Sequence, residues 1–585
     1  MKAKHKKHGV AKKQMPADAL HYLYVANELN SLLCDGRIDK ITMPKRDSIA
    51  LFIRAGGENR CLYISADPSL PRCHLTKRTF QNPPVAPSFL MHLRKHIGGG
   101  KIENVRLLPF ERVLEIKIIS STELKISSEK TLVIEIMGKY SNIILLDEHG
   151  TVSECLRHIS PDVSSKRTVL PGIKLAPPPP QNKSVCDSPA TVKTALNGFC
   201  GGNLCNYILK NVSGLAPVSI KEAVFEALKA TEKGSLTGDE KERVAMSLCA
   251  LYDETTKKPC VATLEGKVVD FFFRPYGSAC ESFEYFDTLN DAMEYYYSRL
   301  DEERQLSEKS KRLASILTAG IAKAEKRLAT LQEKNSSCTD YENDKLFGEL
   351  ITANIYAVKK GAEKLEAVNY YSENGETVTI PLDKNLTPQA NAQKYYKRYA
   401  KKKRTREING IQLQKTHEEL DYLESVMLSV ELAASEAELD PVAAEMESAG
   451  LIVEKSQKSN KKQTLRETGA TEYTVDGYKI LVGKNNLQND KITRNAKPFD
   501  LWLHTKDVHG SHVIVENKSE DFPPDNVLLT AASYAAYFSK ARSADKVAVD
   551  YTFAKNVSKP KGAAAGKVIY VNQFTVFVTP KEPQR

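Results

Sequence analysis

The most distinctive chemical feature of the sequence is a basic, tyrosine-containing segment at residues 394–406. It holds eight lysines and arginines among thirteen residues, without an acidic residue. Like charges four apart on a helix repel one another, so this density favours an anionic partner over a merely solvated helix face. Cations can neutralise phosphates while the interleaved tyrosines stack on bases. The residues predicted here to bind RNA are Lys397, Arg398, Lys401, Lys402, Lys403 and Arg404.

Residues 500–512 contain the single tryptophan of the chain and three histidines. His504, Asp507, His509 and His512 could be considered as metal ligands, but their spacing matches no closed zinc pattern. We therefore expect no metal or other cofactor, and polar side chains that hold phosphate or backbone instead. The residues expected to make such contacts with nucleic acid are His504, Lys506, Asp507, Ser511 and His512.

No motif in the sequence indicates catalysis. The glycine loop at residues 559–567 has three residues between Gly562 and Gly566, and Val568 follows its last lysine. A phosphate-binding P-loop needs four residues between these glycines and a serine or threonine after the lysine. Serine-hydrolase, zinc-protease and dinucleotide-binding motifs are not found either. We therefore expect a protein that is not an enzyme and has no catalytic residues.

The elements that must position these residues form several domains. Residues 15–178 predict a mixed α/β domain, in which the glycines near residues 55–59 indicate a β-hairpin. Leu114, Ile116 and Ile118 alternate with charged residues, as in a strand that is wet on one face. Residues 179–270 predict a small helical domain, with a helix-hairpin-helix-like turn around residues 214–219. Such a turn can present backbone N–H groups to phosphate, but an ordinary turn between packed helices is equally consistent with it.

A long helical arm is predicted at residues 271–453. Residues 413–430 carry apolar side chains at coiled-coil spacing, and residues 306–331 carry a less regular seam. We expect an antiparallel coiled coil whose tip lies at about residues 335–400; a four-helix bundle is the alternative.

The two ends of the chain complete the predicted organisation. Residues 1–14 are interpreted as a basic tail and residues 454–470 as a basic linker. Residues 471–585 predict a C-terminal α/β domain with one clear helix, for which Asp525 is the expected N-cap. The predicted fold class is therefore multidomain α+β.

Composition narrows the class of protein further. The 585 residues are 41% apolar and carry 84 − 73 = 11 excess positive charges, which is ordinary for a globular protein and compatible with nucleic acid. The 11 cysteines contain no CxxC pair, so neither a disulfide framework nor a zinc ribbon fits. No apolar run approaches the length of a membrane span, and no secretory signal is evident. A cytoplasmic protein without a membrane partner is expected.

Several segments of the sequence resemble motifs of the NFACT family, the RqcH/NEMF group of ribosome quality-control factors. The resemblance is collinear over about residues 15–580. The segments that carry it are Phe89–Ile97, Glu135–Leu145, Gly348–Asn354, Leu386–Gln393, Asp500–His512, Asp550–Thr552 and Gly566–Val568.

The resemblance implies a specific role. Bacterial members of this group bind a free large ribosomal subunit that still carries peptidyl-tRNA after a stalled ribosome splits. They recruit alanyl-tRNA for template-free alanine tailing of the nascent chain, while the ribosome performs the chemistry. The expected partners are therefore that subunit, its rRNA and tRNA, with alanine tRNA preferred and no DNA.

The resemblance also implies a tRNA-binding set: Glu111, Arg112, Glu135, Ile136, Met137 and Lys139. Two of these depart from the family pattern. Glu111 replaces an aspartate, and its carboxylate reaches one methylene further. Lys139 replaces an arginine, which keeps the charge but loses the bidentate fork. Ile136 and Met137 could equally be strand core.

Other functions fit parts of the sequence. The older family name, fibronectin-binding protein A-like, suggests a surface adhesin, which would require an export signal or an anchor. A generic tRNA- and rRNA-binding protein without tailing activity is a further alternative.

Overall fold

The computed structural model describes residues 17–80, 82–121, 127–164, 167–179, 181–230, 232–280, 282–372, 375–452 and 469–583. The predicted basic tail and nearly all of the predicted linker lie outside these residues. The described chain divides into two units, residues 1–301 and 302–585. The predicted multidomain α+β fold class is confirmed. No helix within the described ranges is both long enough and apolar enough to cross a membrane.

The first unit is built on a nine-stranded antiparallel sheet with the order β4-β3-β2-β1-β5-β6-β7-β8-β9. Gly56 and Gly57 both have positive φ, which allows the tight turn of the predicted hairpin between the second and third strands. The strands are β1 (Arg37–Lys45), β2 (Ser48–Ala55), β3 (Glu58–Ser65), β4 (Arg72–Thr76), β5 (Lys101–Leu107), β6 (Val113–Ser121), β7 (Ser127–Glu135), β8 (Asn142–Leu146) and β9 (Val152–Cys155).

Helices cover one face of this sheet. α1 (Ala19–Leu33) and α2 (Ser88–Ile97) pack on it, and Leu114, Ile116 and Ile118 of β6 point into the shared core. Val113 lies in a separate cluster on the opposite face, as strand alternation requires. A short 3₁₀ turn, η1 (Gly138–Tyr140), separates β7 from β8.

The rest of the first unit is mostly helical and shares the same core. Gly214, with φ +86°, lies in the predicted turn between α4 and α5, so the two helices form the expected hairpin. Its helices are α3 (Pro189–Leu196), α4 (Leu204–Asn211), α5 (Pro217–Leu228) and α6 (Gly238–Ala250), with η2 (Glu254–Thr256). Its strands are β10 (Gly202–Asn203), β11 (Glu232–Lys233), β12 (Cys260–Leu264), β13 (Lys267–Phe272) and β14 (Phe283–Tyr285).

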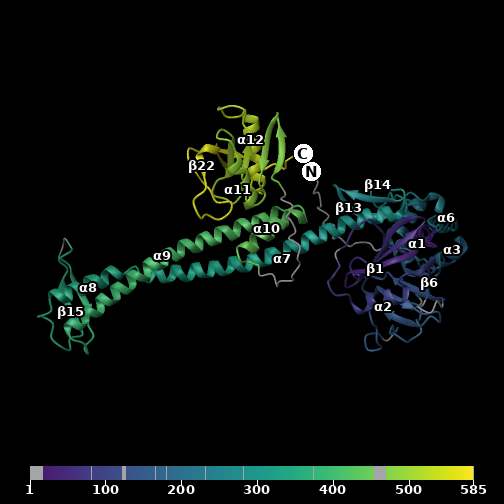
Figure 1. The fold of residues 1–585 in the computed structure, drawn as a ribbon, viewed down its shortest axis with the longest axis horizontal. Coiled ribbons are helices and arrows are strands. Elements are labelled where there is room, and N and C mark those ends of the chain that lie inside the picture. The colour runs from purple at the N-terminus through teal and green to yellow at the C-terminus, as the bar shows by residue number, and fades with distance from the viewer. Residues whose placement is uncertain are drawn as a thin grey trace. The chain divides into compact units, whose positions relative to one another are not determined.

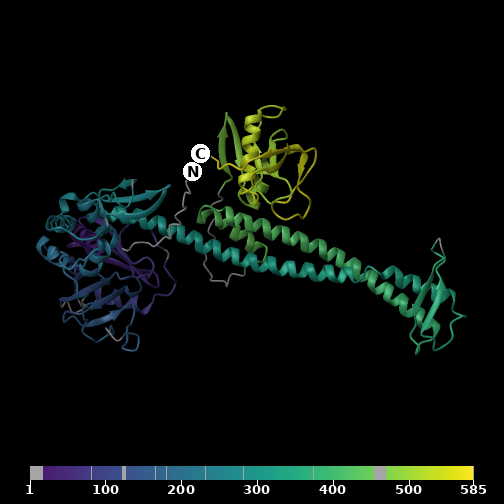
Figure 2. The same cartoon turned by 180° about the vertical axis from the view of Figure 1, so that it is seen from behind.

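α7 (Leu289–Ser336) begins in the first unit and continues in the second, where it forms an arm with α9 (Pro388–Leu432). The two helices run side by side in both views (Figures 1 and 2). Leu313 and Leu317 of α7 meet Leu423 and Val426 of α9 in a buried cluster, which α10 (Glu436–Ser448) also joins. The tip between the long helices consists of α8 (Tyr341–Ala353), β15 (Lys364–Val368) and β16 (Thr377–Pro381). This is the helical arm expected from the two apolar seams.

The C-terminal part of the second unit is a six-stranded antiparallel sheet with the order β17-β18-β20-β19-β21-β24. Its helices are α11 (Asn486–Asn495) and α12 (Asp525–Tyr537), with η3 (Ala554–Asn556). Its strands are β17 (Thr471–Val475), β18 (Tyr478–Val482), β19 (Leu501–Thr505), β20 (Val513–Val515), β21 (Val547–Phe553), β22 (Val557–Ser558), β23 (Ile569–Tyr570) and β24 (Phe574–Val578).

Two sequence expectations about the C-terminal helices were wrong. Asp525 is the first residue of α12, and Pro524 is its N-cap. Proline is well suited to a helix start because its fixed φ is compatible with the first turn. The sequence pattern also missed α11, whose many polar residues gave no apolar periodicity.

Candidate RNA-binding sites

A cleft of about 380 Å³ in the first unit brings together part of the predicted tRNA-binding set. Glu111, Arg112 and Met137 line it, because the backbone N–H of Ile136 donates to the carbonyl of Arg112 and holds the two segments together. The loop Gly214–Pro217, which leads into α5, lines the facing side. Lys183 also lines the cleft, so the cations available to a phosphate there are Arg112 and Lys183.

The other predicted tRNA-binding residues do not line this cleft. Glu135 is buried, and its carboxylate accepts a 2.6 Å hydrogen bond from Arg167. Ile136 is a core residue, so its predicted contact with tRNA would require a local rearrangement. Lys139 is exposed on η1, with its ammonium 4.8 Å from the ring centroid of Tyr140. The cleft therefore gathers half of the predicted set, and their role in tRNA binding stays a prediction.

A residue that the sequence analysis did not single out holds the wall of this cleft in place. The buried carboxylate of Asp18 accepts hydrogen bonds from the backbone N–H of Ala216 (2.9 Å) and the hydroxyl of Ser219 (2.6 Å). It also caps α1 by accepting from the backbone N–H of His21, and it contacts the His21 ring. Burial alone would raise the pKa of Asp18, but these partners, His21 foremost, lower it to about 2.

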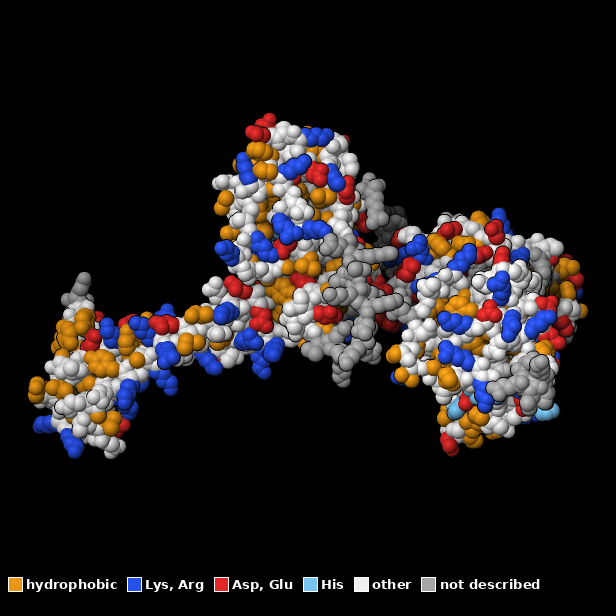
Figure 3. All heavy atoms as spheres, in the orientation of Figure 1, with side chains coloured by type: hydrophobic (Ala, Val, Ile, Leu, Met, Phe, Trp, Pro, Cys, Tyr) orange, Lys and Arg blue, Asp and Glu red, His pale blue; other side chains and the backbone are white. Residues whose placement is uncertain are grey.

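The basic segment of α9 divides into two faces. On one face, Arg398 and Lys402 form ion pairs with Asp344 at 3.1 and 2.8 Å. On the other, Lys397, Lys401 and Arg404 are exposed and have no acidic partner among the residues that the structure describes. Lysine and arginine side chains (blue) follow the surface of the arm in Figure 3. The arm therefore neutralises part of its own charge, and the spacing of four and three leaves a cationic stripe on one face.

Two of the three tyrosines of this segment are less available than the sequence suggested, whereas Tyr396 is exposed. Tyr395 is buried at the tip, where its hydroxyl donates to the carbonyl of Pro381 at 2.6 Å. Tyr399 packs beside Tyr341 of α8, with ring centroids 5.8 Å apart. These rings stabilise the tip, so base stacking by Tyr395 is not supported.

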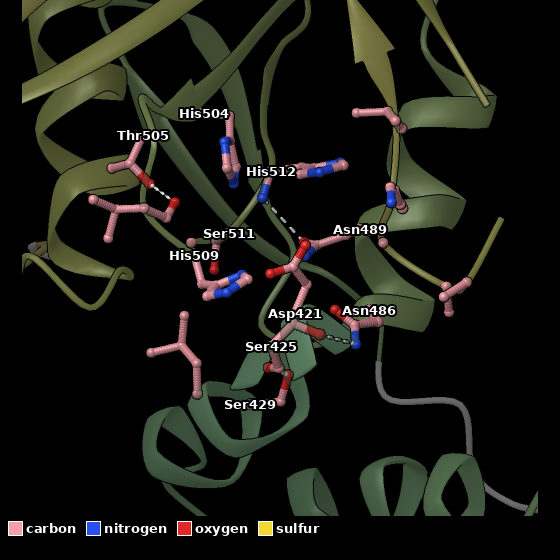
Figure 4. Close-up of a pocket in the computed structure, with 18 of the residues that line it drawn as sticks. Asp421, Ser425, Ser429, Asn486, Asn489, His504, Thr505, His509, Ser511 and His512 are labelled. Atoms are coloured by element: carbon pink, nitrogen blue, oxygen red, sulfur yellow. Dashed lines mark hydrogen bonds between the residues drawn. The ribbon is translucent and has the colours of Figure 1, made fainter. Parts of the chain in front are cut away.

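A second cavity, of about 400 Å³, gathers most of the residues predicted in the C-terminal domain. His504, Asp507, Ser511 and His512 line it, whereas exposed Lys506 does not. Strand alternation explains the grouping: Leu501 and Leu503 of β19 face α12, so Trp502 and His504 must face the opposite side. In Figure 4, His504 and His512 lie next to each other at the top of the cavity, and His509 lies below them.

The imidazoles of this cavity are uncharged at neutral pH. Burial lowers the pKa of His504 to about 4 and the pKa of His512 well below its ordinary value. Burial and the nearby Lys540 ammonium also lower the pKa of His509. These histidines therefore contribute polar groups to the cavity without adding positive charge.

Several residues of this cavity could not be found from sequence reasoning. Asp421, Ser425 and Ser429 come from α9, and Asn486 and Asn489 come from α11 (Figure 4). The amide of Asn486 donates to the hydroxyl of Ser425 at 3.0 Å, which joins the arm to the C-terminal domain. Such contacts between segments some sixty residues apart leave no local pattern.

The structure also identifies where a metal could be held. Within the described ranges, Glu154, Cys155 and His158 place their ligand atoms within 4.8 Å of one another. Among the described residues, the histidines of residues 504–512 do not belong to a group of possible metal ligands of this kind.

Comparison with known proteins covers nearly the whole chain. Residues 18–465 match the family described as "NFACT N-terminal and middle domains", and residues 470–575 match "NFACT protein RNA binding domain". A protein named "Rqc2 homolog RqcH" from Bacillus subtilis is 35% identical over 97% of this chain and 98% of its own length. One of the same name from Streptococcus suis is 32% identical over 97% of this chain and 99% of its own length.

Solved structures resemble parts of the chain. One is described as the N-terminal of the fibronectin/fibrinogen-binding protein from Streptococcus suis. The two sequences are 28% identical, and the match covers 48% of this chain and 98% of the solved chain, with a TM-score of 0.42. The two family matches together extend over both units and both cavities. The chain therefore belongs to the NFACT family.

Proposed function

We propose that this protein is a ribosome quality-control factor that acts in the cytoplasm. In this role it binds free large ribosomal subunits that carry peptidyl-tRNA, and it recruits alanyl-tRNA for template-free alanine tailing of the stalled chain. The observation that carries the proposal is the match to proteins named RqcH, which extends over 97% of this chain and 98% of the Bacillus subtilis relative. The match includes the N-terminal, middle and RNA-binding domains of the family.

The described sites support a binding role. The cleft of the first unit combines Arg112 with Lys183, and two cations suit a phosphate backbone. The stripe formed by Lys397, Lys401 and Arg404 suits rRNA at an exposed face of the arm. The protein would position tRNA while the ribosome forms the peptide bond, so we propose that it is not itself an enzyme.

The two departures from the family pattern lie in different surroundings. Glu111 lines the cleft and accepts a 3.4 Å hydrogen bond from the amide of Gln181. Lys139 lies outside the cleft lining, on an exposed turn. The side chain of Glu111 is longer than that of aspartate, so it changes which atoms a ligand in the cleft can contact. Lys139 is exposed, so its side chain has room to adjust to a ligand. We therefore propose that Glu111 influences the choice of tRNA more than Lys139 does.

Replacing Arg112 by alanine is expected to weaken tRNA binding about tenfold or more, because a hydrogen bond to a charged group contributes about 1.5–3 kcal/mol. Filter binding with purified alanine tRNA measures the change. Arg54→Ala is the matched control, since Arg54 is an exposed arginine of the same sheet and lies outside the cleft. Equal affinities of the two variants would remove Arg112 from the tRNA site.

Sedimentation of cell extract through a sucrose gradient tests the proposed function. The protein should travel with free large subunits and be depleted from intact ribosomes and small subunits. An equal distribution over both subunits would favour generic RNA binding. Recovery in a washed cell-surface fraction would favour an adhesin. Either outcome would overturn the proposal.

A further inference from the structure

The cavity between α9 and the C-terminal sheet contains a buried donor without a partner. Trp502 is fully buried, and its indole N–H has no hydrogen-bond acceptor among the described residues. A buried polar group left unpaired costs about 1–3 kcal/mol. Trp502 is one of the residues that line the cavity, so its surroundings change with what is bound there.

One wall of the cavity consists of planar, uncharged rings. The His504 ring stacks on the Trp502 ring with an interplanar angle of 20°, and the His512 ring meets both edge-on. The partly exposed ring of His509 projects toward the cavity from the loop between β19 and β20 (Figure 4). Aromatic and imidazole faces of this kind are what unstacked bases pack against in RNA complexes.

The opposite wall supplies neutral hydrogen-bonding groups. Ser425 and Ser429 lie on successive turns of α9, and Asn489 lies on α11 facing them (Figure 4). The side-chain oxygen of Asn489 accepts from the backbone N–H of His512 at 3.1 Å, which fixes the orientation of its amide. Amide and hydroxyl groups read the edges of bases.

The rim argues against a phosphate inside the cavity. Glu418, Asp421 and Asp507 line the cavity. Its two lysines are both near carboxylates: Lys567 lies 3.9 Å from Glu418, and Lys484 pairs with Glu438 at 3.1 Å. An anion drawn into the cavity would meet these carboxylates, whereas an uncharged base would not. The exposed ammonium of Lys506 next to this rim suits a phosphate that stays outside.

We propose that this cavity receives a single unstacked nucleobase of an RNA strand, whose sugar and phosphates remain at the rim. The inference rests on the proposed function only in taking RNA as the partner. The cavity volume, about 400 Å³, lies in the range of small-ligand sites. The base packs against the imidazole face of His509 and hydrogen-bonds to the groups on α9 and α11.

The fluorescence of Trp502 tests the inference directly, because it is the only tryptophan of the chain. The full-length protein, without ribosomes, is titrated with each of the four nucleoside monophosphates and with ribose 5-phosphate, which lacks a base. At least one nucleotide should change the emission in a saturable way, and ribose 5-phosphate and inorganic phosphate should not. Equal effects of nucleotide and ribose 5-phosphate, or no effect of any nucleotide, would overturn the inference.

A cavity-filling variant gives an independent test. Ser429 is a largely buried cavity residue on α9, so Ser429→Leu places a larger side chain in the cavity without breaking the helix. The affinity for the nucleotide, measured from the change in Trp502 emission, should fall at least tenfold. Ser307→Leu is the matched control on an exposed face of α7 and should behave as wild type. An unchanged response of Ser429→Leu would contradict the inference.

These tests are separate from the test of the proposed function. Loss of the fluorescence response with normal sedimentation on large subunits would remove the base site and leave the ribosome role intact. A normal fluorescence response without sedimentation on large subunits would remove the ribosome role and leave the base site intact.

Discussion

Replacing Lys397, Lys401 and Arg404 together by glutamate is expected to weaken binding to large ribosomal subunits about a hundredfold and to reduce its dependence on salt. Each cation that neutralises a phosphate contributes about 0.7–0.9 to the slope of log affinity against log salt. Loss of three such contacts should therefore lower the slope by about 2 to 3. Sedimentation or filter binding at several salt concentrations measures both quantities.

The choice of these three residues follows from the ion pairs of the tip. Arg398 and Lys402 already bond to Asp344, so their replacement would disturb the fold of the tip as well as any RNA contact. The matched control reverses three exposed lysines on α7 of the same arm, Lys311, Lys323 and Lys326. Both triple variants change the net charge equally. If the control weakened binding as much as the α9 variant, general electrostatics would account for the effect and the stripe would have no specific role.

Replacing Asp18 by alanine is expected to destabilise the first unit by about 3–5 kcal/mol. The change removes an N-cap and leaves the buried donors of Ala216 and Ser219 without their acceptor. Hydrogen exchange followed by mass spectrometry on peptides of α1 and α5 measures this loss within the full-length chain. Asp253→Ala is the matched control, because Asp253 is exposed and bonds only within its own turn; less than about 1 kcal/mol is expected. Equal effects would contradict the assigned role of Asp18.

The same carboxylate predicts a specific pH dependence. The pKa of Asp18 is about 2 in the folded protein against 3.8 for an ordinary aspartate. The folded state therefore prefers the ionised form, which contributes about 2 kcal/mol of stability at neutral pH. This contribution is complete above about pH 4 and is lost as the pH falls toward 2. The stability difference between wild type and Asp18→Ala should narrow over that range, and a constant difference would contradict the ionised role.

Local patterns in the sequence predicted the elements that depend on local chemistry. The hairpin at Gly56 and Gly57 follows from the positive φ that glycine allows. The alternation of Leu114, Ile116 and Ile118 predicted which face of β6 is buried. Most of the polar residues predicted in 500–512 line one cavity, and their role in binding stays a prediction.

Features that depend on distant partners could not be predicted. The basic segment looked uniformly available in the sequence, but Asp344, some fifty residues earlier, pairs with two of its cations. Asp18 gave no signal because its partner Ser219 lies 201 residues away. Trp502 stood out only as a single tryptophan, and its unpaired indole N–H becomes apparent only when the cavity around it is assembled.

The most direct test of the central claim is a pull-down of the tagged protein from its own cytosol, followed by sequencing of the retained RNA. The account predicts rRNA of the large subunit without rRNA of the small subunit, together with enrichment of alanine tRNA over other tRNAs. Retention of both rRNAs in equal amounts, or of no specific RNA, would contradict a ribosome quality-control role. Large-subunit rRNA with an unselective mixture of tRNAs would contradict the alanine specificity that we propose.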